Sequence, residues 1–222
     1  MRCNSYIRKA VENKNWAFVS DYFRLRALYE FGGIYLDTDV EIYKSFDDLL
    51  SKKGFVGYMH DALIGTAVLG FEKKNLFIKK LLDLYDNAEW IEGKYDLFRI
   101  KFENGDSYLC NANNSVFTWA VFHFYDNFKL NGNYQETADF SVFPKTEFEI
   151  GTFWGKRSHC VHRCESSWKT KNNKKELYKI VKNAVKYIPV IHMDAIIRNI
   201  SYEKHMQKSV FYERYLHDTA SA

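Results

Sequence analysis

The chain has 222 residues, 46% of them hydrophobic, and a formal net charge of +4. This length suffices for one sizeable core. The net charge is small and the acidic and basic residues are interspersed, so charge does not indicate a nucleic-acid-binding protein. No run of 18 apolar residues occurs and the N-terminus lacks the apolar stretch of a signal peptide, which predicts a cytoplasmic protein without a transmembrane segment. Peripheral association with the inner face of the membrane stays open, and the four cysteines are expected to be thiols.

The first third of the chain predicts two helices followed by short strands. Apolar spacing predicts an amphipathic helix over residues 6–18. Ser20 can cap a second helix that ends at the glycine pair 32–33, with Asp21 in its first turn. Short apolar runs then predict strands over residues 34–36, 54–59 and 62–71, and residues 41–50 lead through a turn into a short helix.

The rest of the chain predicts an alternation of helices and strands. Helices are expected over 76–85 and 116–124 and strands over 140–143 and 159–162, whereas 86–110 gives no clear pattern. Residues 170–222 begin with a lysine-rich run, typical of a solvated helix face, and are expected to be a mostly helical part of the same domain. The alternation predicts a single α/β domain over residues 1–222. Ligands of such sheets bind at the carboxyl ends of the strands.

The segment IYLDTDV places two carboxylates at such a strand end. In a continuing strand Asp37 and Asp39 would share one face, where they would repel each other unless a cation lay between them. Mg²⁺ takes one or two carboxylates and completes its shell with water and phosphate oxygens. The pair therefore suits a metal–diphosphate site, and the alternative is a solvated turn with two capping aspartates.

The helix that precedes this strand carries a second charged pair. Asp21 and Arg24 are three residues apart and share a helix face, which would point toward the same strand end if the glycine turn is tight. Both side chains can hydrogen-bond sugar hydroxyls, and the arginine does so with a planar fork of donors. The alternative is a structural ion pair within the helix.

The stretch SDYFRLRALYEFGGIYLDTDVE resembles the signature of the DXD-containing sugar transferases of glycosyltransferase family 32. These include bacterial capsule-type and yeast mannosyltransferase-type enzymes, and the catalytic core of the large clostridial glucosylating toxins has the same arrangement. The resemblance is most specific from Trp16 to about Leu50. It implies a GT-A-like fold, in which helices flank a mixed central sheet, and sugar transfer with retention of anomeric configuration.

The resemblance also implies roles for individual residues. Asp39 would ligate Mn²⁺ or Mg²⁺ directly, and Asp37 would act on the metal through water or contact the ribose or the sugar. Asp21 and Arg24 would hold the hydroxyls of the donor sugar, so that Asp21, Arg24 and Asp37 count as catalytic. Tyr35 would line the donor pocket. Ser20 would position the start of the helix.

A second cluster, HCVHRCESSW, spans residues 159–168. On its own it suggests zinc, because Cys160, His162 and Cys164 alternate along a strand and His159 precedes them. Four ligands in six residues do not easily form a tetrahedron, however. The family commonly has a pattern like H-H-x-x-x-S-W here, which His162 matches although Arg163 departs from it.

The same match covers Ser167 and Trp168. By resemblance His162 is a metal ligand and Ser167 lies near the metal or the phosphate. Trp168 would be a catalytic residue that donates its indole N–H toward the diphosphate, and the alternative for it is a core aromatic. In the middle of the chain, Asp61 could approach the reacting centre.

Family members normally begin with a strand–helix unit that this chain lacks at its front, so a neighbouring strand edge is expected to be exposed. The leading hypothesis is a metal-dependent transfer of a sugar from a nucleotide-diphospho-sugar to a saccharide acceptor in polysaccharide or glycan synthesis, and the bacterial-type resemblance favours UDP. A catalytically impaired remnant that binds a glycan or a protein is the alternative. A metal phosphohydrolase lacks the further carboxylates and histidines that such sites need.

Overall fold

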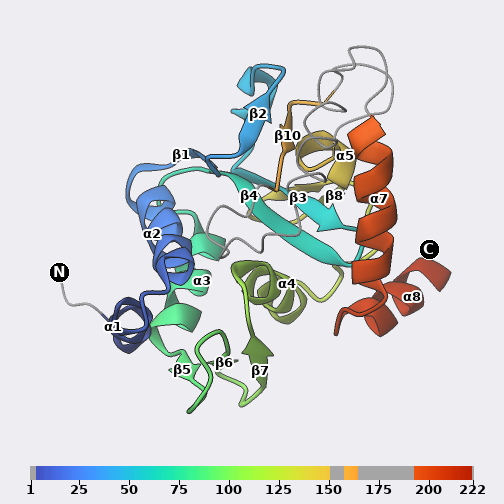
Figure 1. Ribbon diagram of the computed structural model, residues 1–222. Helices are drawn as coiled ribbons and strands as arrows, with labels where there is room; N and C mark the ends of the chain where they lie inside the picture. Colours follow the sequence, from blue (N-terminus) through green and yellow to red (C-terminus); the bar gives the residue numbers. More distant parts are fainter. Residues whose placement is uncertain (1–3, 151–157, 165–192, 222) are drawn as a thin grey trace, which may run out of the picture.

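The computed structural model describes residues 4–150, 158–164 and 193–221 of the protein (Figure 1). At its centre is a five-stranded sheet in the order β1-β4-β3-β9-β8. The β3–β9 pair is parallel and the other pairs are antiparallel, which makes the sheet mixed. Its strands are β1 (Gly33–Leu36), β3 (Gly54–His60), β4 (Leu63–Phe71), β8 (Gln135–Glu136) and β9 (Ser141–Phe143).

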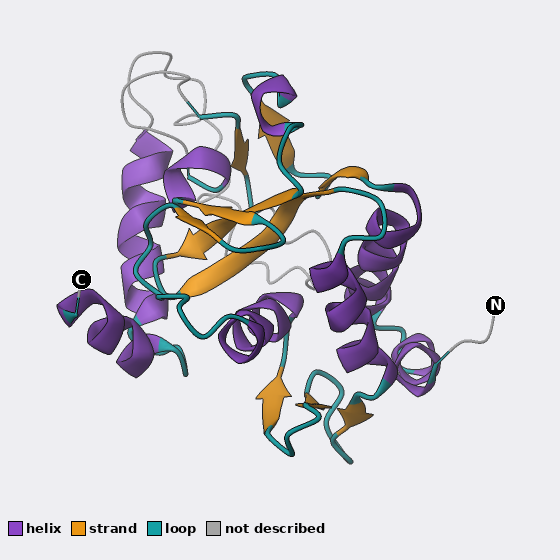
Figure 2. Cartoon of the chain, turned by 180° about the vertical axis from the view of Figure 1, so that it is seen from behind, coloured by secondary structure: helices purple, strands orange, loops and turns teal. Residues whose placement is uncertain are grey.

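Helices lie on both sides of this sheet, as the view from behind also shows (Figure 2). The longer ones are α1 (Ser5–Glu12), α2 (Trp16–Phe31), α3 (Leu76–Asp86), α4 (Asn113–Phe124), α7 (Met193–Met206) and α8 (Tyr212–Ala220). Two short elements, the 3₁₀ helix η1 (Asp47–Leu49) and α5 (Lys145–Phe148), belong to the opposite side from α1–α4. Two small sheets complete the fold: β2 (Val40–Ile42) with β10 (Cys160–His162), and β5 (Glu89–Trp90) with β6 (Phe98–Lys101) and β7 (Ser107–Cys110).

Alternation along the central strands produces two apolar clusters, one on each face of the sheet. Val56 of β3 and Leu69 of β4 pack into the larger cluster with α1, α2, α3 and α4. Their neighbours Phe55 and Val68 belong to the smaller cluster, with η1, α5 and β10. This is the period of two that a strand buried on both faces requires. The mixed α/β architecture expected for a GT-A-like glycosyltransferase fold is confirmed.

The glycine pair after α2 turns the chain directly into β1. Gly32 is the C-cap of α2, with φ +70°, and its N–H donates to the carbonyl of Leu28 at 2.8 Å. A Cβ at this position would lie 2.7 Å from the backbone nitrogen of Lys73. Only glycine combines the left-handed backbone with so close an approach. The predicted end of the helix and the tight turn after it are therefore confirmed.

The predicted start of this helix was wrong. The segment expected to be one helix over 6–18 contains all but the first residue of α1 and the beginning of α2, and residues 13–15 separate the two helices. Asn15, and not Ser20, is the N-cap of α2, and Ser20 lies one turn inside it, where its hydroxyl donates to the carbonyl of Ala17 at 2.7 Å. The side-chain cap in this region is Asn4, which accepts from the N–H of Ile7 at the start of α1.

Most of the other elements predicted from the sequence are present in the structure. The strands and helices predicted between residues 54 and 124 are present with ends shifted by a few residues, and the unassigned stretch 86–110 forms the β5–β6–β7 sheet. Within 170–222 the structure describes α7 and α8, as the helical prediction requires, and the lysine-rich run lies outside the described residues. Among the described residues β1 pairs with β4 alone, so it forms one edge of the central sheet.

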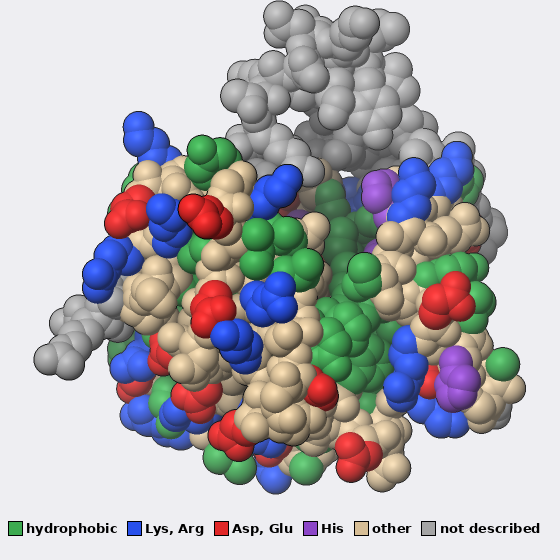
Figure 3. All heavy atoms as spheres, turned by 90° about the horizontal axis from the view of Figure 1, so that it is seen from below, with side chains coloured by type: hydrophobic (Ala, Val, Ile, Leu, Met, Phe, Trp, Pro, Cys, Tyr) green, Lys and Arg blue, Asp and Glu red, His purple; other side chains and the backbone are tan. Residues whose placement is uncertain are grey.

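One cavity of about 400 Å³ lies between β7, α4 and the start of α8. The stacked rings of Tyr108 and Trp119 line it together with Phe211, and Arg214 borders it. Figure 3 looks onto this face and shows a hydrophobic hollow beside basic and histidine side chains. None of the predicted site residues in the described ranges lines this cavity. No helix in the described part of the chain combines the length and the apolar character needed to cross a bilayer.

Candidate functional site

The two aspartates lie in the turn that joins β1 to β2. The N–H of Asp37 still pairs with the carbonyl of Ala67 on β4 at 2.8 Å, and the carbonyl of Asp37 accepts from Val40 at 3.1 Å. Thr38 and Asp39 form the turn between these contacts. The chain leaves the sheet immediately after Asp37, so the two aspartates lie in a turn and do not share one face of a continuing strand. The position at the carboxyl end of a strand is confirmed.

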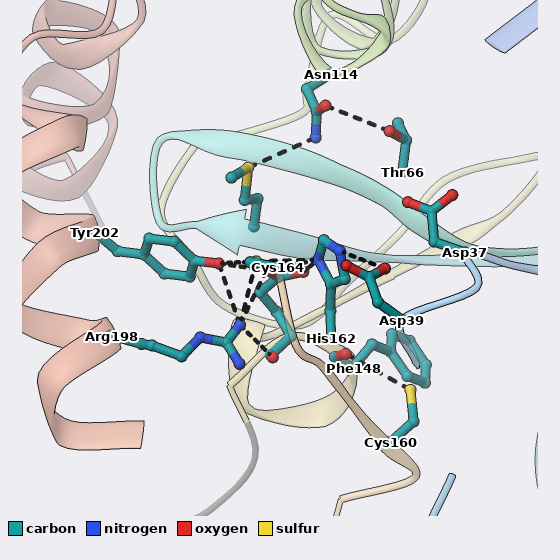
Figure 4. A network of polar contacts seen from close by, with 12 residues as sticks. Asp37, Asp39, Thr66, Asn114, Phe148, Cys160, His162, Cys164, Arg198 and Tyr202 are labelled. Atoms are coloured by element: carbon teal, nitrogen blue, oxygen red, sulfur yellow. Dashed lines mark hydrogen bonds and ion pairs between the residues drawn. The ribbon is translucent and has the colours of Figure 1, made fainter. Parts of the chain in front are cut away.

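Pairing of β2 with β10 brings His162 of the second predicted cluster to this turn. His162 lies opposite Val40 in the antiparallel register, and its Nε2 is 3.2 Å from Oδ1 of Asp39. The N–H of Arg163 donates to the carbonyl of Asp39 at 2.8 Å. One ligand atom from each of Asp37, Asp39 and His162 falls within 4.8 Å of the other two. Figure 4 shows His162 directed at Asp39, with Asp37 beside it at the end of the strand.

Arg24 links α2 to the same turn. Its guanidinium is 3.0 Å from Oδ1 of Asp21 and 3.2 Å from Oδ1 of Asp37, and it donates to the carbonyl of Thr66 at 2.9 Å. The guanidinium also lies over the ring of Tyr35, 4.4 Å from its centroid. The face shared by Asp21 and Arg24 thus points at the strand end, as predicted. The ion pair within the helix is present as well, as the alternative interpretation requires, and contact of the pair with a sugar stays a prediction.

Burial sets the electrostatics of this network. Burial raises the pKa of Asp21 to about 6, with Arg24 lowering it and the charge of Asp37 raising it further. Burial also raises the pKa of Tyr35, whose hydroxyl donates to Oδ1 of Asp37 at 2.7 Å. Keeping the carboxylate of Asp21 buried and charged costs stability. Such a cost is common at functional sites, which need a charge in a fixed position.

His162 lies between two carboxylates. Its Nε2 faces Asp39, and its Nδ1 is 3.0 and 3.1 Å from the two carboxylate oxygens of Glu149. Burial alone would lower the pKa of His162, but its contacts with Cys164 and Glu149 outweigh this and raise that pKa to about 11. These contacts favour the protonated form of His162 in the folded protein.

The residues around the turn fit a divalent cation. Asp37 and Asp39 supply carboxylate oxygens and His162 supplies an imidazole nitrogen, a donor set that suits Mn²⁺ and, with water and phosphate oxygens, Mg²⁺. The side chains of these residues are 27%, 20% and 16% exposed, so they remain accessible to a ligand. The pair Asp21–Arg24 borders the same turn through Asp37.

The remaining predicted residues have different positions. Ser20 is exposed on α2, and its hydroxyl is 3.4 Å from Nη2 of Arg24, so it borders the network without capping the helix. Ser167 and Trp168 lie outside the described residues. Asp61 forms a part-buried ion pair with Lys145, with 2.6 Å between Oδ2 and Nζ.

Of the four residues in the zinc alternative, only His162 and Cys164 contact each other, at 3.4 Å. Nε2 of His159 contacts Asp48 at 2.8 Å and its Nδ1 contacts Glu147, whereas Cys160 is buried in the smaller apolar cluster. Strand β10 ends at His162, and Cys164, with φ +51°, turns its thiol toward Glu149 at 3.4 Å. The cysteines at 110, 160 and 164 are thiols, as predicted.

Several residues of the site were not predicted. Glu149 contacts His162, and Arg198 and Tyr202 of α7 contact Glu149. Asn114 at the start of α4 accepts from the hydroxyl of Thr66 at 3.3 Å, next to the carbonyl that Arg24 binds. None of these residues belongs to a local motif. Only the three-dimensional pairing of β2 with β10 and the docking of α7 bring them together.

The comparisons with known proteins agree with this site. Residues 4–56 match the family described as a glycosyltransferase sugar-binding region containing a DXD motif. The matched range includes α1, α2, β1 and the turn with Asp37 and Asp39, so it covers the carboxylate half of the site and the arginine that borders it.

Similarity also extends beyond that region. The chain is 38% identical, over 138 residues, to an uncharacterised protein of Arabidopsis thaliana. The aligned part is 59% of this chain and 20% of the relative, so the chain spans about a fifth of the length of the curated protein that it matches. No solved structure matches the chain.

Proposed function

We propose that this protein transfers a sugar from a nucleotide-diphospho-sugar, with UDP favoured as the nucleotide, to a saccharide acceptor, and that it retains the anomeric configuration. The observation that carries the proposal is the convergence of Asp37, Asp39 and His162 within 4.8 Å at the end of β1. The match of residues 4–56 to a DXD-containing sugar-binding region supports sugar as the transferred group.

The chemistry of each side chain in the site suggests its role in the proposed reaction. Asp37, Asp39 and His162 would hold Mn²⁺ or Mg²⁺, which as a Lewis acid would stabilise the charge on the departing diphosphate. Ser167 and Trp168 belong to the same proposal through the sequence pattern they share with His162. Arg24 and Asp21 offer a donor and an acceptor for sugar hydroxyls beside Asp37, and Tyr35 fixes the Asp37 carboxylate with its hydroxyl.

A thermal-shift measurement tests the proposal directly. A ligand that binds only the folded state raises the unfolding midpoint by mass action. We expect UDP to raise the midpoint when Mn²⁺ is present, and to have little effect when EDTA replaces the metal. GDP under the same conditions tests the choice of base, and release of free sugar from a UDP-sugar tests the reaction.

Two variants make the test specific. Asp39→Asn should abolish the metal-dependent shift, because it removes a charged oxygen ligand with little change in shape. Asp83→Asn is the matched control, since Asp83 is a half-exposed aspartate on α3 whose carboxylate pairs only with Lys79 among the described residues. A wild-type protein that shows no metal-dependent shift with either nucleotide would overturn the proposal and favour a glycan- or protein-binding module.

A further inference from the structure

The contacts of His162 raise a question that the metal site alone does not answer. An imidazole can ligate a metal only through a nitrogen that has lost its proton, and a neutral ring has just one such nitrogen. The ring must therefore keep its proton on Nδ1 if Nε2, which faces Asp39 at 3.2 Å, is to bind the cation. A hydrogen-bond acceptor at Nδ1 is needed to keep the proton there and to hold the ring in this orientation.

Glu149 is the group in position to do so. Both of its carboxylate oxygens lie within 3.1 Å of Nδ1, and its backbone carbonyl accepts from the N–H of His162 at 3.1 Å. Glu149 thus holds the ring and the backbone of the same residue. Its side chain is only 5% exposed, so water does not compete for the carboxylate. A carboxylate behind a ligating histidine is a recurrent arrangement that orients the ring and increases its basicity.

A buried carboxylate needs donors of its own, and α7 provides them. Nη2 of Arg198 is 3.3 Å from Oε1 of Glu149 and 3.0 Å from its carbonyl, and the hydroxyl of Tyr202 donates to Oε1. Arg198 and Tyr202 are one helical turn apart and contact each other at 3.2 Å. Figure 4 shows both side chains reaching from α7 toward His162, on the side of the ring opposite Asp39.

Cys164 completes this cluster without replacing any of these groups. Its thiol is 3.4 Å from Nδ1 of His162 and 3.2 Å from the hydroxyl of Tyr202. Glu149, His162 and Cys164 could in principle hold a metal themselves. The guanidinium of Arg198 already supplies a positive charge there, 3.3 Å from Glu149 and 3.6 Å from the thiol. Charge balance therefore favours an orienting role for Glu149 over a second metal site.

We propose that Glu149 is a positioning residue that holds His162 with Nε2 directed at the metal site, and that Arg198 and Tyr202 of the C-terminal helix α7 hold Glu149 in place. This inference rests on the proposed function, because it takes His162 to be a metal ligand. Under this inference, two further parts of the chain set the metal affinity. One is the carboxylate of Glu149, directly after α5, and the other is helix α7, which begins more than 150 residues after Asp39.

Binding of Mn²⁺, followed through the EPR signal of the free ion, tests the inference without reference to activity. We expect Glu149→Gln to weaken Mn²⁺ binding by roughly 10- to 100-fold, the range typical of lost orienting partners. Pulsed EPR of the bound ion should show coupling to one imidazole nitrogen in the wild type. That coupling should be weakened in Glu149→Gln and absent in His162→Ala.

A matched control and a milder variant accompany this test. Asp48→Asn removes a carboxylate that contacts the nearby His159 at 2.8 Å, a histidine that does not face the aspartate turn, and it should leave Mn²⁺ affinity unchanged. Tyr202→Phe keeps the ring and removes one donor to Glu149, and it should weaken binding severalfold. This variant decides the matter if Glu149→Gln does not fold.

The outcomes separate the two proposals. Unchanged Mn²⁺ affinity and nitrogen coupling in Glu149→Gln, or in Tyr202→Phe if the former does not fold, would overturn the role of Glu149 and leave the proposed function intact. Wild-type Mn²⁺ binding without nitrogen coupling would overturn it too, because His162 would not be a ligand. A folded wild type that binds no Mn²⁺ would overturn both proposals.

Discussion

Nη1 of Arg24 lies 3.2 Å from Oδ1 of Asp37, which joins the middle of helix α2 to the first aspartate of the DTD turn. The two residues are separated by the end of the helix, the glycine pair and all of β1. Because Gly32 and Gly33 turn the chain back at once, the strand carries Asp37 alongside the helix face that holds Arg24. The contact explains why the helix, the glycines and the aspartates occur as one sequence signature.

The first prediction concerns this arginine. Arg24→Gln should lower the free energy of unfolding by about 3 kcal/mol, because it leaves the carboxylate of Asp21 buried without its cation. Denaturation by urea measures the change. Arg26→Gln on the same helix is the control, since Arg26 pairs with Glu30 at the surface and its loss should cost less than about 0.5 kcal/mol.

A double variant checks the physical reason. Adding Asp21→Asn to Arg24→Gln removes the uncompensated charge, so the double variant should be more stable than Arg24→Gln alone. Equal or greater destabilisation in the double variant would mean that the arginine acts through packing on Tyr35 or through its bond to the carbonyl of Thr66, and not through charge.

The second prediction follows from the raised pKa of Asp21. This pKa is about 6 in the folded protein, mainly because of burial, against 3.8 for an ordinary aspartate. The folded state therefore binds the proton more tightly than the unfolded state. The stabilisation from this proton is fully present below pH 4 and is lost as the pH rises through 6, a loss of up to about 3 kcal/mol.

Asp21→Asn removes this dependence. The free energy of unfolding of the variant, relative to the wild type, should rise by up to about 3 kcal/mol between pH 4 and pH 7. Urea denaturation at several pH values measures it. The exposed Asp83→Asn should show no comparable trend, and a stability difference between the wild type and Asp21→Asn that stays constant with pH would contradict the assignment. Under the proposed function, the same substitution should abolish sugar transfer, because it removes the charged acceptor for the hydroxyls of the donor sugar.

The third prediction separates the positioning of Asp37 from its charge. Tyr35→Phe removes the hydroxyl that donates to Oδ1 of Asp37 at 2.7 Å and keeps the ring under Arg24. We expect a loss of stability of about 1 kcal/mol and a severalfold weaker effect of Mn²⁺ and UDP on the unfolding midpoint. Tyr134→Phe, at an exposed pair with Glu136, is the control. An unchanged response to ligand would show that Arg24 alone positions Asp37.

The sequence predicts the aspartate half of the site well because its determinants are local. The glycine pair, the strand and the spacing of Asp21 and Arg24 are all within 20 residues, and each is dictated by backbone sterics or helical periodicity. The same reasoning fails for Ser20. The apolar residues of helix α2 do not gather on one face, so periodicity does not mark its start, and a serine inside the helix is easily mistaken for its cap.

The histidine half depends on contacts that no local pattern contains. His162 reaches Asp39 because β10 pairs with β2, two three-residue strands that are separated by more than 100 residues. Glu149 lies at the end of a single helical turn, and Arg198 and Tyr202 lie on a helix whose spacing indicates only that they share a face. Resemblance indicates His162, but its partners become visible only when the fold places them around it.

The last prediction compares a buried and an exposed apolar residue of helix α2. Leu25 is fully buried in the larger apolar cluster, whereas Phe31 is 81% exposed beside the edge strand β1. Leu25→Ala should lower the free energy of unfolding by 2–5 kcal/mol, roughly the range for a buried leucine, and Phe31→Ala should change it by less than about 0.5 kcal/mol. Urea denaturation at two protein concentrations measures both. A large, concentration-dependent loss in Phe31→Ala would contradict the prediction, because it would mean that another surface covers this end of α2 in solution.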